Sequence, residues 1–129
     1  MTEINLTDNA DEILRAFEHQ KKTALEAIGL QAEGYAKLKA PTRSGVLKNS
    51  LTHTVREDTA YIGTNVYYAK YVELGTGIYY PEGRKGGWRY QDEKGNWHFT
   101  YGSKPHHFLQ YAMEQGDEYK AIAKHYLSL

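Results

Sequence analysis

Three histidines and one glutamate have side chains that could support catalysis or bind a metal. His106 and His107 are adjacent in the sequence, and His98 and Glu73 lie elsewhere in the same half of the chain. Neighbouring residues of a helix point about 100° apart, so His106 and His107 are poorly placed to hold one metal ion. Zinc-binding helices space their histidines four residues apart instead. We expect no metal and no cofactor here, and a polar pair at the start of a helix.

Glu73 is the only acid in the tyrosine-rich stretch "YAKYVELGTG", residues 68–77. A carboxylate among tyrosines could act as a general base with a raised pKa. It more often accepts hydrogen bonds from tyrosine hydroxyls or backbone amides, or pairs with an arginine of a neighbour. A small metal- or histidine-dependent hydrolase or nuclease that uses Glu73, His98 or His106 remains the alternative function.

Two glycine-rich stretches and one serine are the remaining candidates for chemistry. The stretches "GTG" (75–77) and "GRKGG" (83–87) lack the Gly-Lys-Ser/Thr ending and the strand-to-helix setting of a phosphate-binding loop. We interpret them as turns and a mobile loop. Ser44 precedes Gly45, but the glycine-flanked nucleophile elbow is absent. The sequence therefore predicts no enzyme.

Composition narrows the class of protein further. The chain has 129 residues, no cysteine, and 16 basic against 16 acidic residues. We expect one domain, residues 1–129, without disulfides or thiolate metal sites. Balanced charge argues against DNA binding as the main function, because such binding depends on excess Lys and Arg. A local basic patch stays open, with Arg43, Lys48, Arg84, Lys85 and Arg89 as its candidates. No apolar run is long enough for a membrane span, and no signal peptide is expected.

The first elements that must position these residues are a long helix and a hairpin. Apolar residues recur every three or four positions over 8–39, which predicts one helix, about 45 Å long. Such a helix is longer than a compact domain of this size, so part of it should extend beyond its own core. Residues 46–65 alternate in polarity and predict an antiparallel hairpin. Residues 66–75 fit a short helix or a strand, and the spacing of Tyr68, Tyr71 and Val72 favours the helix.

The second half of the chain contains what we call the arm, residues 76–104. It combines a glycine-rich loop with a second predicted hairpin, in which Gly95 supplies the positive φ of a tight turn. We expect all five of its strand aromatics to project from one face: Trp88, Tyr90, Trp97, Phe99 and Tyr101. Residues 105–127 read as a C-terminal helix. The predicted fold is α+β, with the two terminal helices packed on a mainly antiparallel sheet and an extended aromatic hairpin arm.

Four stretches, in order, carry a resemblance to a known family. They are "APTRSGVLKNSL", "YIGTNVYYAKYVELGTG", "GGW" with its aromatic hairpin, and "KPHHFLQYAM". Together they resemble the tailed-phage family named after gp10 of phage HK97, over about residues 40–113 and the preceding helix. Ser44 stands where threonine is usual, and His106-His107 where Arg-Pro is typical. The second departure argues against a fixed contact made by a positive charge at residue 107.

The resemblance implies a non-enzymatic virion protein, made in the host bacterial cytoplasm, in the neck or tail. Its implied role is head–tail joining, tail completion or tail termination. Implied partners are further copies in a ring of six or twelve subunits, head-closure or connector proteins, and tail tube proteins, with DNA only passing through the channel and no membrane.

The chain contains 12 tyrosines against 3 phenylalanines, and Tyr and Trp suit surfaces that partners bury. The alternative is that the arm aromatics cover the N-terminal helix as ordinary core. The candidate interface residues are Tyr68, Tyr71, Glu73, Tyr79, Tyr80, Trp88, Tyr90, Trp97, Phe99, Tyr101 and Phe108.

Overall fold

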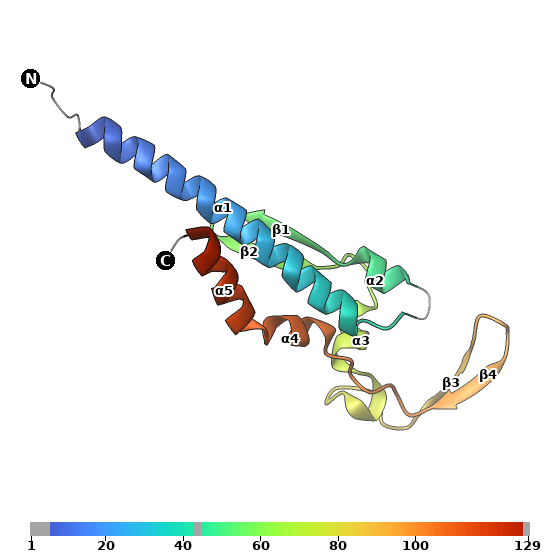
Figure 1. Ribbon diagram of the computed structural model, residues 1–129. Coiled ribbons are helices and arrows are strands. Elements are labelled where there is room, and N and C mark those ends of the chain that lie inside the picture. Colours follow the sequence, from blue (N-terminus) through green and yellow to red (C-terminus); the bar gives the residue numbers. More distant parts are fainter. Residues whose placement is uncertain (1–5, 43–44, 128–129) are drawn as a thin grey trace, which may run out of the picture.

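A single long helix is the element against which most of the molecule packs. The structure is a computed structural model that describes residues 6–42 and 45–127. Helix α1 (Leu6–Lys39) has 34 residues, which corresponds to about 51 Å. Every side chain from residue 10 to residue 20 is exposed, and Figure 1 shows this end of α1 running on past the other elements. The long N-terminal helix is therefore confirmed, and part of it extends beyond the core.

The first hairpin is shorter than its sequence pattern predicts. Strands β1 (Thr52–Arg56) and β2 (Thr59–Gly63) pair antiparallel. The prediction that the hairpin begins at residue 46 is wrong, because residues 46–50 form helix α2 (Val46–Ser50). Leu47 and Leu51 are four residues apart, and one helical turn brings both into the core. Strand alternation begins only after Leu51.

A charged network holds the first hairpin against α1. His53 of β1 lies between two glutamates of α1, with Nδ1 3.0 Å from Glu33 Oε1 and Nε2 3.3 Å from Glu26 Oε2. Lys37 Nζ approaches Glu33 Oε2 at 3.2 Å. Partial burial pushes the pKa of Glu33 up, but the hydrogen bonds from His53 and Lys37 outweigh it and the pKa falls below its usual 4.5. Gly29 leaves room for the imidazole, since a Cβ there would lie 2.8 Å from His53 Cδ2.

The core lies along the second half of α1. It is built from four alanines, of which Ala36 lies in α1, and three larger residues: Ala36, Ala40, Leu47, Leu51, Ala69, Phe108 and Ala112. The first hairpin lies along one side of α1, and the C-terminal helices contact another. Small alanine side chains let these elements approach α1 closely, and Phe108, which is fully buried, fills the space between them.

The C-terminal helix is broken rather than continuous over 105–127. It consists of α4 (Phe108–Met113) and α5 (Gly116–Leu127), joined by a bend at residues 114–115. Both helices contact α1. The bend changes the direction of the chain, so that α4 and α5 can each pack against α1. Tyr119 donates its hydroxyl to the Ala112 carbonyl across the bend, and Tyr35 of α1 packs edge-on against Tyr111 and Tyr119.

The remaining elements belong to the connection and the arm. They are α3 (Ala69–Leu74), the short 3₁₀ helix η1 (Gly77–Tyr79), β3 (Trp88–Gln91) and β4 (Trp97–Thr100). β3 and β4 form a second two-stranded antiparallel sheet that is separate from β1–β2. The α+β class is confirmed, with two small hairpins in place of one sheet. Among the described helices, none has the length and apolarity that crossing a bilayer requires.

Candidate protein–protein interface

Glu73, at the end of α3, holds the start of α4. Its carboxylate accepts hydrogen bonds from the backbone N–H groups of Leu109 and Gln110, each at 2.9 Å. The backbone amides of His106 and His107 donate to the carbonyls of Val72 and Glu73, at 2.9 and 3.2 Å. The first amides of a helix have no partner inside it, so Glu73 caps α4 from a distant part of the chain. The carboxylate thus has a structural role.

The stretch "GTG" is a rigid base for the arm. Thr76 N–H donates to the Ser103 carbonyl at 2.9 Å, and Ser103 N–H donates to Thr76 Oγ1 at 2.8 Å. Ile78 N–H donates to the Tyr101 carbonyl at 2.9 Å. Gly77 has φ 61°, and a side chain there would collide with the Tyr101 carbonyl. Glycine therefore allows two backbones to approach closely, and the interpretation of this stretch as a simple turn is incomplete.

The loop after this base folds back onto it. Lys85 donates from Nζ to the Tyr80 carbonyl at 2.6 Å and to the Gly77 carbonyl at 3.3 Å. Gly83 packs its backbone against Gly77, leaving no space for a Cβ. The arm is thus connected to the body through a hydrogen-bonded root.

Asp92 orders the tip of the arm hairpin. Its Oδ1 accepts from the backbone amides of Lys94 and Asn96 at 2.9 and 2.8 Å. Its Oδ2 lies 2.7 Å from His98 Nε2. The hydrogen bond from His98, followed by that from Asn96, holds the pKa of Asp92 below its usual 3.8. Gly95 completes the turn with φ 83°, as the turn chemistry predicts.

The arm aromatics divide between two faces, so the prediction of a single aromatic face is wrong. In antiparallel strands, directly opposed residues share a face. Tyr90 opposes His98, and Gln91 opposes Trp97, so even-numbered residues of both strands form one face and odd-numbered residues the other. One face contains Trp88, Tyr90 and His98, and the other contains Arg89, Trp97 and Phe99. Tyr90 stacks on His98 with ring centroids 5.2 Å apart, and Arg89 lies 5.5 Å from the Trp97 ring centroid.

The arm hairpin projects away from α1 (Figure 1). Trp97 is 61% exposed and Phe99 57%. The alternative that these aromatics cover the N-terminal helix is therefore wrong. The prediction that Phe108 belongs to an interface is also wrong, because it is fully buried in the core. The other candidates lie at the surface: Tyr71, Tyr79, Tyr90 and Tyr101 are exposed, while Tyr68, Glu73, Tyr80 and Trp88 are half-buried.

Sequence reasoning missed the most exposed aromatic residue. Tyr67 is 87% exposed and packs edge-on against Tyr68, with ring centroids 5.5 Å apart. It borders an apolar hollow of about 430 Å³ that lies between α3 and Leu109. Helical spacing could not have found it, because Tyr67 lies in the turn before α3.

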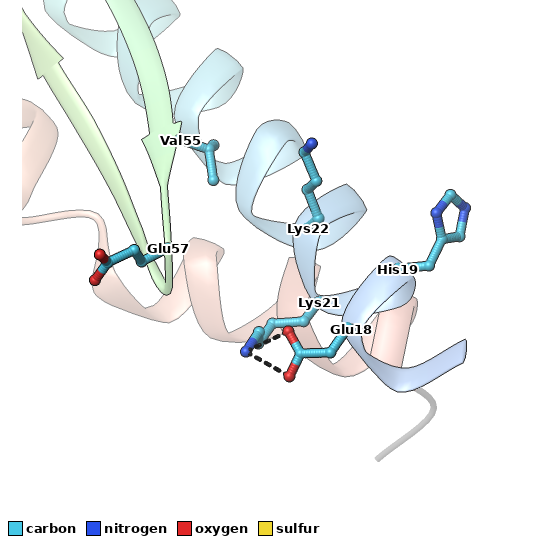
Figure 2. A pocket seen from close by; sticks show the side chains of 6 residues that line it. All are labelled: Glu18, His19, Lys21, Lys22, Val55 and Glu57. Atoms are coloured by element: carbon cyan, nitrogen blue, oxygen red, sulfur yellow. Dashed lines mark hydrogen bonds and ion pairs between the residues drawn. The ribbon is translucent and has the colours of Figure 1, made fainter. Parts of the chain in front are cut away.

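A second hollow, of about 360 Å³, lies between α1 and the turn of the first hairpin (Figure 2). Lys21 and Glu18 neutralise each other there at 2.9 Å, and Lys21 also pairs with Asp58 at 2.6 Å. Figure 2 shows His19 pointing away from the hairpin. Within residues 6–42 and 45–127, no three His, Asp or Glu residues are grouped so that they could hold a metal ion. The residues that line these two hollows do not form a group of side chains that could carry out catalysis.

The proposed basic patch has a mixed outcome. Arg43 lies outside the described residues. Lys85 donates to backbone carbonyls, and Arg89 lies over Trp97. These two cations therefore stabilise the arm, and their contacts give no reason to assign them to DNA.

A comparison with protein families identifies the part of the chain from α1 to α3. A family model described as "Bacteriophage HK97-gp10, putative tail-component" matches residues 5–75, which is 71 of the 129 residues. The chain belongs to this family. It is therefore a structural component related to the phage tail. The HK97-gp10-like match covers α1 to α3 and ends at the root of the arm. No curated protein and no solved structure gives a significant match.

Proposed function

We propose that this HK97-gp10-like protein is a non-enzymatic subunit of the phage neck. It joins head to tail, or completes or terminates the tail, as part of a ring of six or twelve copies around the DNA channel. Head-closure or connector proteins and tail tube proteins are its proposed partners. DNA passes through the channel without a dedicated binding site.

The observation that carries this proposal is the exposed aromatic arm on a rigid root. Trp97 and Phe99 lie on a hairpin whose base is fixed by the backbone hydrogen bonds of residues 76–78 to residues 101–103. Large exposed aromatics are costly in a lone soluble domain and are typical of surfaces that a partner covers. The family description supports the same conclusion for a tail-related protein.

The residues of the alternative enzyme serve the fold. Glu73 caps α4, and His98 bridges Asp92 and Tyr90 at the tip of the arm. His106 is exposed, and its backbone amide bonds to α3. Three groups that hold separate elements in place do not form a shared reaction centre. The arrangement therefore favours assembly over hydrolysis.

A deletion of the gene from the phage or prophage that carries it tests the function. We expect lysates with complete heads and tails that remain unjoined, or tails of abnormal length, and rescue by the wild-type gene supplied in trans. Gold-labelled antibody against the protein should mark the neck or the head-proximal tail end in electron micrographs. Normal infectious particles without the protein would refute the proposal.

A further inference from the structure

The molecule exposes apolar side chains at two opposite ends. One end is the α1 tip, which we define as residues 10–20, and the other is the arm (Figure 1). At 100° per residue, Ile13, Leu14 and Phe17 form one stripe of the α1 tip. Ile13 is 67% exposed and Leu14 60%. This stripe continues the one that packs in the core further along α1, but no element of the described chain covers it.

The two ends have opposite charge. The α1 tip contains three acidic residues and one basic residue, a net charge of −2, and the arm contains five basic and three acidic residues, a net charge of +2. On the helix, Asp11 lies beside Leu14, as does Glu18, which is paired with Lys21 at 2.9 Å, whereas Arg15 lies on the far side. On the arm, Arg89 lies on the same face as Trp97 and Phe99. An apolar stripe with an acidic border therefore exists on the same chain as an aromatic face with a cation.

We propose that the odd-numbered face of the arm, with Arg89, Trp97 and Phe99, binds the α1 tip of a neighbouring copy of this chain. This inference rests on the proposed function, because it names the two surfaces that join ring subunits. Two different patches of one chain form a heterologous contact, which closes into a ring when the rotation allows it. The acidic border of the tip would then meet Arg89.

Charge favours this pairing over the two symmetric ones, through Asp11 on the tip and Arg89 on the arm. Two α1 tips together would join charges of −2 and −2, and two arms would join +2 and +2, which opposes association. The dimensions also agree. Four-residue strands are about 13 Å long, and the stripe from Ile13 to Phe17 is about 6 Å long, so the strand face is long enough to cover it. Such a contact is smaller than a standard interface, so we expect micromolar affinity for a single link and stronger binding through ring closure.

Two full-length variants test the pairing by complementation. The arm variant carries Trp97→Thr and Phe99→Thr, and the tip variant carries Leu14→Gln and Phe17→Gln. Threonine is favourable in a strand and glutamine in a helix, so neither pair of replacements should disturb its element. Circular dichroism checks that both variants are folded. Each variant alone keeps only one half of the contact, so we expect both to be monomers by light scattering at about 100 µM. Mixed, they should form a 1:1 dimer of doubled mass and nothing larger.

Leu38→Gln is the matched control, because Leu38 is an exposed leucine of α1 outside the tip. It should assemble like the wild type. A mixture that stays monomeric refutes the proposal, and so does an arm variant that self-associates like the wild type. If the deletion phenotype above is observed while the mixture stays monomeric, the proposed function holds and this inference fails.

A charge exchange supplies an independent measurement. Arg89→Glu should weaken self-association at least tenfold, and adding Asp11→Arg to the same chain should restore most of it. Restoration requires that the two positions meet between copies, since the α1 tip and β3 lie at opposite ends of the molecule (Figure 1). Absence of restoration in folded protein would contradict the arrangement.

Discussion

Replacing Glu73 by glutamine should destabilise the protein by loosening α4 from α3. The carboxylate accepts two backbone hydrogen bonds, one with each oxygen. Glutamine has nearly the same shape but only one accepting oxygen. Its amide nitrogen would direct N–H groups at the amide of Leu109 or Gln110. One of these donors therefore loses its partner, and the other exchanges a charged acceptor for a neutral one.

The magnitude follows from these two bonds. A hydrogen bond to a charged group contributes about 1.5–3 kcal/mol and a neutral one about 1 kcal/mol. Loss of a helix cap costs about 0.5–2 kcal/mol. Because Glu73 is half-buried, water partly compensates the orphaned amide, and we expect a loss of about 2 kcal/mol. For a chain of this size, that lowers the unfolding midpoint by roughly 8 °C.

Thermal and urea unfolding monitored by circular dichroism measure this loss. Glu114→Gln is the matched control, because Glu114 is exposed and, among the described residues, its carboxylate accepts only from the side chain of Gln110, at 3.0 Å. Its effect should stay within about 0.5 kcal/mol. Equal midpoints for the two variants would show that the Glu73 carboxylate does not hold α4.

Three further predictions concern the core and α1. Gly29→Ala should lower the urea midpoint, because its Cβ would push against His53 on β1, whereas Gly34→Ala, where the space is open, should raise stability by about 1 kcal/mol. Phe108→Ala should cost about 3–5 kcal/mol in urea unfolding, since the ring is fully buried. Glu33 has a folded-state pKa below its usual 4.5, so its contribution is complete above that value and disappears as the pH falls through the lower folded-state pKa. Unfolding free energies between about pH 6 and pH 3 should therefore decrease less steeply for Glu33→Gln than for the wild type.

Local patterns were sufficient for the elements whose signals lie within a few residues. The apolar spacing of α1 and the turn chemistry around Gly95 depend on neighbours in the chain. The α2 segment was predicted as a strand because the polar–apolar alternation of β1 follows it directly. Leu47 and Leu51 are also spaced by one helical turn, and both are buried. Short segments satisfy both periods, and only packing decides between them.

Contacts across long separations could not be predicted in the same way. The partners of Glu73 lie 36 and 37 residues further along the chain, and no spacing rule connects them. The two faces of the arm depend on which residues oppose each other, and a shift of one residue would exchange them. Phe108 shows the same limit, because an aromatic residue at the start of a helix fits both a core and a surface until its neighbours are known.

The hydrogen-bonded root of the arm lowers the entropic cost of the proposed assembly. A flexible arm that ordered only on binding would lose about 1 kcal/mol of backbone entropy per residue, and residues 76–104 comprise 29 positions. A contact of a few exposed aromatics could not offset such a cost. Here the hydrogen bonds between residues 76–78 and 101–103, together with Asp92 at the tip, fix the arm within the folded chain. In the proposed assembly, binding would then order mainly side chains, so that a small contact could be sufficient for association. Gly77, Gly83 and Gly102 therefore contribute close backbone packing at the root of the arm.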